Sequence, residues 1–396
     1  MRTQVACFGQ TPPQLFTAPH PPRRAALPFL RPVHWGPTGG LSASCRPFVR
    51  VPLKLVATAQ TGRGLALSAL TVVGEPDGRR VLAIDASSTV HSFRWPPQAG
   101  RAPQVVSARR HCSTQLPASD SNKSACIALL DAAPLGGRGV YVLTGGHFDG
   151  ALCVSSEGGR TLHVELQHSR SITCVALSAS GTLLLTGAAD TTVVLWELEA
   201  AAKGAVQPLP LHTLRGHVRE LSAVALSHEL SLAASGAADG SVLLHTTHNG
   251  SLVRSISSPD KQPVGHLLFS AIHGRIVMGA TAAERLFVFS LSGVQLAALE
   301  QKGGVRCSLV SPDGALLLAG GVNGSVSAWR LDDGSLATSF DGAEAAISCA
   351  CIMHDPARGS ELLIGTQEGD ILGFGVDPGI LYGSPMRDVA AWAAPR

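Results

Sequence analysis

Charged side chains are scarce in this 396-residue sequence. They make up 15% of the residues, against about 25% in an average soluble domain. Disordered chains and coiled coils carry far more charge, so the composition argues against both classes. The formal net charge of +3 gives no electrostatic case for nucleic-acid binding, which calls for a clustered basic face. Glycine is abundant instead, with 43 residues, as expected for short buried strands joined by frequent turns.

Long hydrophobic runs are also missing. No window of 18 residues is free of charged and turn-forming residues, so we expect no membrane-spanning helix. The N-terminal residues, MRTQVACFGQTPPQLF, lack the apolar segment of a secretory signal, and we expect no export. The nine cysteines show no disulfide framework, and Cys174, Cys307, Cys349 and Cys351 lie inside apolar runs. We interpret them as reduced core residues of a cytoplasmic protein.

Residues 171–196 show how the chain is organised. Three apolar runs, 172–177, 183–185 and 193–196, are separated by turn residues, which predicts three short strands. The same pattern recurs along the chain and ends at seven anchor residues. These anchors are Phe93, Ser155, Trp196, His245, Phe289, Trp329 and Phe374.

The anchors are separated by 62, 41, 49, 44, 40 and 45 residues. Apart from the first, these spacings are close to the roughly 40–45 residues of one four-stranded propeller blade. A blade exposes two apolar faces, and stacking blades in a closed ring covers all of them. The repeats therefore predict an all-β protein, a β-propeller with seven blades.

The blade that ends at Trp196 resembles a WD40 repeat. His168 precedes that tryptophan by 28 residues and Asp190 precedes it by six. The resemblance implies a hydrogen-bonded set of His168, Thr186, Asp190 and Trp196. In the next blade the same positions hold His217, Ser235, Asp239 and His245, so a histidine replaces the tryptophan. Further along, Asn323 and Glu368 take the place of the aspartate.

A second resemblance concerns residues 8–23, FGQTPPQLFTAPHPPR, which are similar to the C-terminal end of a BEACH domain. The matching residues are Phe8, Gly9, Gln10, Thr11, Pro12, Gln14, Leu15, Phe16, Pro19, His20 and Pro21. In that family a WD40 propeller commonly follows. Residues 144–154, TGGHFDGALCV, and residues 214–256 resemble neurobeachin-type propellers in particular. The bulk of a BEACH domain is not in the sequence, so we expect a fragment or a truncated gene model.

These observations divide the chain into four parts. Residues 1–24 are interpreted as the end of a BEACH domain, 25–60 as a linker, 61–380 as the propeller and 381–396 as a flexible tail. Within the linker, residues 48–56 are the candidate for a strand that closes the last blade. Residues 96–125, rich in Pro, Ser and Arg, account for the long first spacing. We interpret them as a disordered surface loop, with a binding loop as the alternative.

Candidate catalytic groups do not assemble. His163, Glu165 and His168 fall in or beside a predicted strand, which points the two histidines to opposite faces, so we expect no metal site. The sequence has no phosphate-binding glycine loop and no nucleophile elbow. We therefore predict no catalytic residue, cofactor or metal ligand. The predicted partner contacts are His147, Arg219 and Glu220, where loops reach a propeller face.

The resemblance implies a protein-interaction scaffold of the BEACH–WD40 class. That family acts in vesicle and endomembrane trafficking, in lysosome-related organelles and in autophagy. We expect a cytoplasmic protein that binds other proteins, with membrane contact at most peripheral or indirect and no nucleic-acid partner. The alternatives are a generic WD40 adaptor, such as a ligase substrate receptor, and a propeller enzyme. An enzyme would need clustered polar residues on the innermost strands, and residues 174–178 are Cys, Val, Ala, Leu and Ser.

Overall fold

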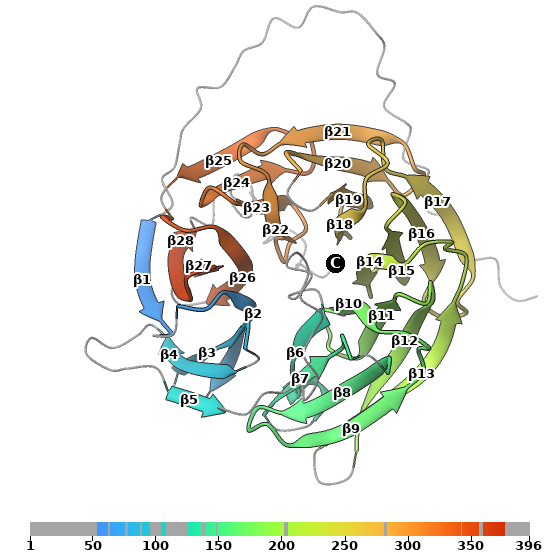
Figure 1. Cartoon of the computed structure of the whole chain (residues 1–396). Helices are drawn as coiled ribbons and strands as arrows, with labels where there is room; N and C mark the ends of the chain where they lie inside the picture. Colours follow the sequence, from blue (N-terminus) through green and yellow to red (C-terminus); the bar gives the residue numbers. More distant parts are fainter. Residues whose placement is uncertain are drawn as a thin grey trace, which may run out of the picture. The chain divides into compact units, whose positions relative to one another are not determined.

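The computed structural model describes residues 54–376, except 62–63, 76–77, 88, 96–103, 108–125, 137–138, 148, 202–204, 281–282, 342 and 356–358. These residues belong to one compact unit, Val49–Arg396. Within it, seven four-stranded antiparallel sheets follow one another around a ring (Figure 1). The BEACH-end motif at residues 8–21 and the tail at 381–396 lie outside the described residues.

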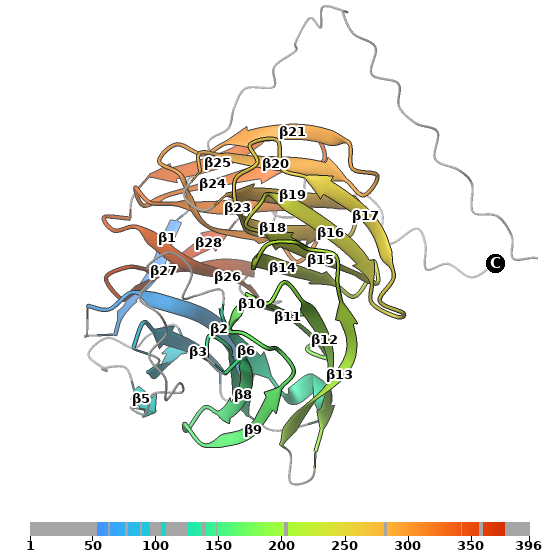
Figure 2. The ribbon, with the colours of Figure 1, turned by 45° about the vertical axis from the view of Figure 1, so that its right-hand side comes forward.

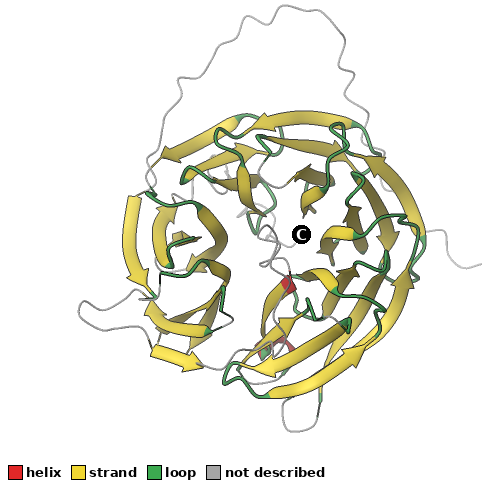
Figure 3. Ribbon diagram, in the orientation of Figure 1, coloured by secondary structure: helices red, strands yellow, loops and turns green. Residues whose placement is uncertain are grey.

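The described residues form strands joined by short loops and turns (Figure 3). Blades 1 and 2 hold β2 (Leu67–Glu75), β3 (Gly78–Asp85), β4 (Val90–Trp95), β5 (Gln104–Ser107), β6 (Ile127–Asp131), β7 (Val140–Thr144), β8 (Ala151–Ser156) and β9 (Thr161–Leu166). Blades 3 and 4 hold β10 (Ile172–Leu177), β11 (Leu183–Ala188), β12 (Val193–Ala200), β13 (Val206–Leu214), β14 (Leu221–Ser227), β15 (Leu232–Ala237), β16 (Ser241–Thr246) and β17 (Leu252–Ser257). A 3-10 turn, η2 (Ala133–Leu135), follows β6.

The remaining blades continue the same meander. Blades 5 and 6 hold β18 (Val264–Ser270), β19 (Arg275–Ala280), β20 (Arg285–Ser290), β21 (Gln295–Glu300), β22 (Val305–Val310), β23 (Leu316–Gly321), β24 (Ser325–Arg330) and β25 (Leu336–Asp341). Blade 7 holds β26 (Ile347–Asp355), β27 (Gly359–Thr366), β28 (Asp370–Val376) and β1 (Lys54–Gln60). The structure thus confirms the predicted seven-bladed β-propeller.

Each blade begins at the axis of the ring and ends at its rim (Figure 1). Because the strands alternate in direction, the linkers between blades lie at the same end as the turns between second and third strands. We call this end the top face and the opposite end the bottom face. Six of the seven inner strands carry a register shift after their first residue, as between Ile172 and Cys174 in β10.

The core consists of seven apolar clusters, one between each pair of neighbouring blades. Alternate side chains of one strand serve two clusters. On β11, for example, Leu184 packs toward blade 2 and Leu185 toward blade 4. The turned view shows neighbouring blades standing face to face (Figure 2). This double burial explains why the strand sequences are continuously apolar and why one blade cannot bury its faces alone.

Cysteines fill spaces that glycines leave open in three blades. Cys174, Cys307 and Cys349 are the register partners of Gly187, Gly320 and Gly365. A Cβ added to these glycines would lie only 2.6–2.8 Å from the facing Sγ atom. The six cysteines of the described residues are all free, and burial raises the pKa of the Cys174 thiol to about 12. Cys174 and Cys349 are buried, and Cys307 and Cys351 are partly buried against the core clusters. All four are free thiols that pack in the core, as the sequence predicts.

The ring closes through β1, which pairs with β28 from Lys54↔Gly375 to Gln60↔Asp370. This strand overlaps the predicted closing strand, residues 48–56, only at its last three positions; residues 48–53 lie outside the described part. The difference has a physical reason, because Ala59 of β1 is buried in the cluster between blades 7 and 1. Nearby, Trp95 Nε1 donates a 2.8 Å hydrogen bond to Glu361 Oε2 across the same interface.

The segment at residues 96–125 is not entirely a loop. Residues 104–107, QVVS, form β5, which pairs with β4 and completes blade 1. The interpretation of residues 96–125 as one surface loop was therefore wrong at these four positions. The two valines favour a strand, and the edge of β4 offers unpaired backbone groups that they can satisfy. The flanking residues 96–103 and 108–125 are outside the described part of the chain.

Candidate functional site

The four residues of the expected WD40 set lie together at the top of blade 3. His168 lies in the linker between β9 and β10, Thr186 on β11, Asp190 in the turn after β11 and Trp196 on β12. His168 Nε2 is 2.8 Å from Thr186 Oγ1, and Trp196 Nε1 donates to the same hydroxyl at 2.9 Å. His168 Nδ1 lies 3.4 Å from Asp190 Oδ2. One network therefore joins the linker, the turn and two strands.

Thr192 sets the direction of the hydrogen bonds in this network. Its hydroxyl donates to Asp190 Oδ1 at 2.6 Å, so it accepts from His168 Nδ1–H, 3.1 Å away. The other ring nitrogen of His168 then accepts from Thr186, whose oxygen accepts from the indole of Trp196. The donors run in one direction, from the buried indole to the carboxylate in the turn. Such aligned hydrogen bonds polarise one another and strengthen the whole chain.

The charges of this network are those of an ionised acid and a neutral base. Burial favours the neutral carboxyl of Asp190, but hydrogen bonds from the Thr192 side chain and amide and from the Ser169 amide outweigh it and hold its pKa below the usual value. Burial lowers the pKa of His168 and outweighs the attraction of Asp190. His168 is thus a neutral hydrogen-bonding group at neutral pH and not a charged one.

Blade 4 repeats only the part of the network that joins the linker histidine to the second strand and to the turn. His217 Nε2 is 2.8 Å from Ser235 Oγ, and its Nδ1 is 3.2 Å from Ser241 Oγ. Ser241 in turn donates to Asp239 Oδ1 at 2.6 Å. His245, in the place of the tryptophan, is 3% exposed, and its Nδ1 has no hydrogen-bond partner among the described residues. Among the described residues, no hydrogen bond joins His245 to Ser235, whereas Trp196 donates to Thr186 in blade 3.

Blade 6 contains an uncharged version that sequence reasoning missed. Gln301 Nε2 donates to Ser325 Oγ at 2.8 Å, and Ser325 donates to Asn323 Oδ1 at 2.6 Å. The available signal was the spacing, since Gln301 precedes Trp329 by the same 28 residues that separate His168 from Trp196. In blade 7, Glu368 is exposed, and Thr366 Oγ1 accepts from the amide of Asp370 instead.

Blade 1 contains a buried acid–base pair that was also missed. Asp85 Oδ2 lies 2.9 Å from His91 Nε2, and both side chains are fully buried. Asp85 Oδ1 accepts from the amides of Ser87 and Thr89 and from the Ser87 hydroxyl. Although burial opposes the charge, the hydrogen bonds from His91, Ser87 and Thr89 lower the pKa of Asp85 to about 2. The run of Asp85 and hydroxyl residues before β4 was the signal available in the sequence.

The linker at residues 215–220 presents side chains at the top of blade 4. His217 is buried and bonded, whereas Val218, Arg219 and Glu220 are exposed, Val218 to 83%. His147, the third predicted contact, lies between β7 and β8 and is only 5% exposed; its contact with a partner stays a prediction. Arg219 and Glu220 remain available on the surface.

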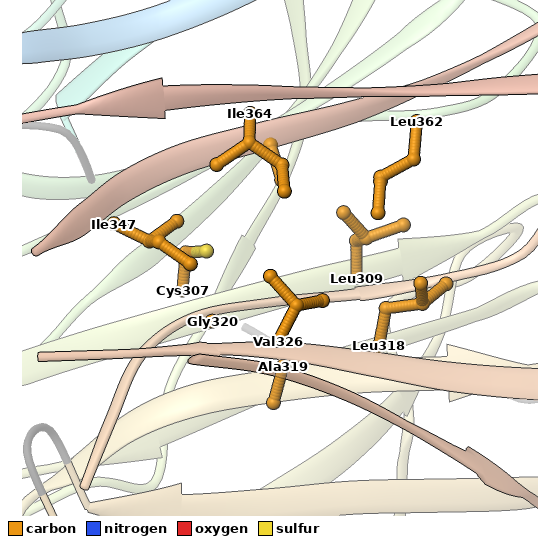
Figure 4. A pocket seen from close by; sticks show the side chains of 10 residues that line it. Cys307, Leu309, Leu318, Ala319, Gly320, Val326, Ile347, Leu362 and Ile364 are labelled. Atoms are coloured by element: carbon orange, nitrogen blue, oxygen red, sulfur yellow. The ribbon is translucent and has the colours of Figure 1, made fainter. Parts of the chain in front are cut away.

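The described side chains form no metal centre. The described residues hold no cluster of three or more His, Cys, Asp or Glu side chains that could bind a metal ion. A small gap between blades 6 and 7 is lined by apolar side chains such as Leu309, Ile347 and Leu362 (Figure 4). Its volume of about 10 Å³ approaches that of one water, which an apolar lining would not hold. Among the described residues, no helix is long and apolar enough to span a bilayer.

Comparisons with known proteins give the family. Residues 92–381 match the model of the neurobeachin beta propeller domain. The chain is 27% identical over 94% of its length to BEACH domain-containing protein B of Arabidopsis thaliana, and 24% identical over 83% to a putative neurobeachin homolog of Caenorhabditis elegans. It spans only 15% and 14% of these relatives. The predicted resemblance is confirmed: this chain belongs to the neurobeachin beta propeller family.

Proposed function

We propose that this propeller is a non-enzymatic protein-interaction scaffold of a BEACH–WD40 protein. It would act at the cytoplasmic side of endomembranes, in vesicle trafficking, lysosome-related organelles or autophagy, by holding partner proteins on its loops. Membrane contact would be peripheral or indirect. The fold supports this role because loops on a rigid ring can vary without disturbing the core.

The linker at residues 215–220 is the observation that carries the proposal. Its centre is fixed by His217, which contacts Ser235 at 2.8 Å and Ser241 at 3.2 Å. Its next three residues are exposed. A partner that binds such a loop loses little conformational entropy on ordering it, so the contacts made there contribute more fully to affinity.

The proposal of a non-enzymatic role is supported by the state of the reactive groups. The thiols of Cys174, Cys307 and Cys349 have pKa values raised by burial to about 12, so they are not nucleophiles at neutral pH. Burial lowers the pKa of His168 and of His217, and both rings are engaged by hydroxyl groups. These groups stabilise turns and are not presented to a substrate.

A generic WD40 adaptor is the remaining alternative. The names of the relatives, a BEACH domain-containing protein and neurobeachin homologs, favour the BEACH–WD40 class over a ligase substrate receptor. The BEACH-end motif at residues 8–21 would separate the two most directly, and it stays a prediction.

Proximity labelling in cells tests the proposal. The full chain is fused to a labelling enzyme, and the labelled proteins are quantified for the wild type and two variants. Val218→Glu changes the exposed top-face linker, and Ile272→Glu is the control on the bottom face, where the side chain is 69% exposed. We expect endomembrane trafficking proteins that are lost with Val218→Glu and retained with Ile272→Glu. A label set that neither variant changes would contradict the proposal.

A further inference from the structure

We propose that the top face of blades 3 to 6 binds an acidic, partly aliphatic peptide segment of a partner protein. The surface is formed by the linkers that lead into β10, β14, β18 and β22, which surround the axis of the ring in consecutive blades (Figure 1). We call it the basic arc, and its residues are Arg170, Arg215, Val218, Arg219, Lys261 and Lys302. This inference rests on the proposed scaffold function and names the chemistry of one partner.

The cations of the basic arc are concentrated and unpaired. The four linkers, residues 167–171, 215–220, 258–263 and 301–304, contain five cations and only two acids, Glu220 and Asp260. Their excess of three positive charges equals the formal net charge of the whole chain. All five cations are exposed, and none forms an ion pair within the part of the chain that the structure describes. They are free to meet carboxylates from outside.

The turns beside these linkers have the opposite character. In the same four blades, the turns between the second and third strands contain three acids, Asp190, Asp239 and Glu284, and no lysine or arginine. Asp190 and Asp239 direct oxygen atoms at their own turns, accepting from Thr192 and Ser241. Hydrogen bonds from Ser241, the largest cause, lower the pKa of Asp239. These carboxylates therefore bond to their own turns, while the neighbouring cations form no ion pair with another described residue.

The interleaving of charges favours a peptide over other anionic partners. A nucleic-acid backbone or an anionic bilayer presents closely spaced negative charge, which would meet Asp190, Asp239 and Glu284 as well as the cations. A peptide can place single carboxylates beside the linkers and avoid the turns. Val218, 83% exposed in the middle of the arc, offers an apolar contact that a purely electrostatic partner would not use.

Fluorescence anisotropy with the full chain tests this inference. The probe is a labelled library of 12-residue peptides, each with four Asp or Glu and two Leu or Ile; the reference library carries Asn and Gln in place of the acids. The test variant is Arg170→Glu with Arg219→Glu. The control is Arg160→Glu, an exposed arginine in the bottom-face turn between β8 and β9.

We expect the acidic library to bind, more weakly as salt increases. The double reversal should lower affinity about tenfold, which corresponds to about 1.4 kcal/mol from the loss of two exposed ion pairs. Arg160→Glu should bind as the wild type. Equal binding of the two libraries would overturn the inference, as would binding to phosphatidylserine vesicles alone. If acidic peptides fail while Val218→Glu still removes cellular partners, the scaffold function stands and only this partner chemistry is wrong.

Discussion

Blades 3 and 4 carry the same top-face network with different ends. In both, a neutral histidine joins a strand hydroxyl to a hydroxyl bound by an aspartate. In blade 3 the buried indole of Trp196 donates a hydrogen bond to Thr186. In blade 4, His245 has a ring nitrogen without a partner among the described residues. The comparison separates two roles. The histidine and aspartate hold the linker on its turn, and the tryptophan ties both to the core.

The largest expected effect is the loss of the tryptophan. Trp196 is fully buried in the cluster between blades 2 and 3, so Trp196→Ala should lower the free energy of unfolding by about 3–5 kcal/mol. His245→Ala should cost clearly less, because it removes a smaller side chain that is incompletely bonded. Denaturant titration of the full chain measures both, with exposed Arg219→Ala as the control expected within about 0.5 kcal/mol of wild type. Equal losses for Trp196 and His245 would contradict the comparison.

Loss of the turn aspartate should also cost more stability in blade 3 than in blade 4. Asp190 is half-buried, accepts from Ser169 and Thr192 and lies 3.4 Å from His168 Nδ1, so Asp190→Ala should cost about 1–3 kcal/mol. Asp239 is exposed, and Asp239→Ala should cost at most about 1 kcal/mol because water replaces its bonds to Ser241. Unfolding free energies measured at one salt concentration give the difference. A larger loss at Asp239 would show that exposure does not govern these turns.

A tryptophan at position 245 should give blade 4 the hydrogen bond that Trp196 makes in blade 3. In His245→Trp the indole can donate to Ser235, which lacks the donor that Thr186 receives in blade 3, so we expect a gain of about 1 kcal/mol in unfolding free energy. His245→Phe is the matched control, with an aromatic ring and no donor. If the phenylalanine variant gains as much as the tryptophan variant, the gain comes from packing alone.

Acid should lower the stability of the ring, because its buried histidines resist protonation in the folded state. Burial lowers the folded-state pKa of His168, His217 and His266, the last to about 4. Below pH 6.5 the unfolded chain therefore binds protons that the folded chain does not. Stability is complete above that pH and falls as the pH drops toward 4. Thermal unfolding midpoints recorded between pH 8 and pH 4 measure this loss.

A blade 6-like network should remove part of this pH dependence. His217→Gln with Asp239→Asn reproduces the pairing of Gln301 and Asn323, which contains no titrating group. At pH 7 this variant should stay close to the wild type, and its midpoint should fall less steeply on acidification. An unchanged slope would mean that His217 does not contribute to acid sensitivity.

The repeating features were predictable because each blade solves the same packing problem. The spacings of 28 and six residues located His168, Asp190 and Trp196, since they are set by three strands and two turns whose lengths repeat from blade to blade. The missed features depend on neighbours along the ring. β5 forms because β4 has an open edge, and His147 is buried by its surroundings. Asp85 and His91 come together across the turn of a β-hairpin; they are six residues apart, like Asp190 and Trp196, but His91 lies two residues before the anchor Phe93.

Closure of the ring by β1 has a mechanical consequence. Lys54 pairs with Gly375 at the open end of the β1–β28 ladder, so the chain enters and leaves the ring at adjacent points. Tension applied before Lys54 and after Val376 would load this outermost pair first and then each following pair in turn, as in a zipper. Blade 7 is accordingly where a pulling force carried by flanking polypeptide would first open the ring, and the other six blades would be shielded until it did.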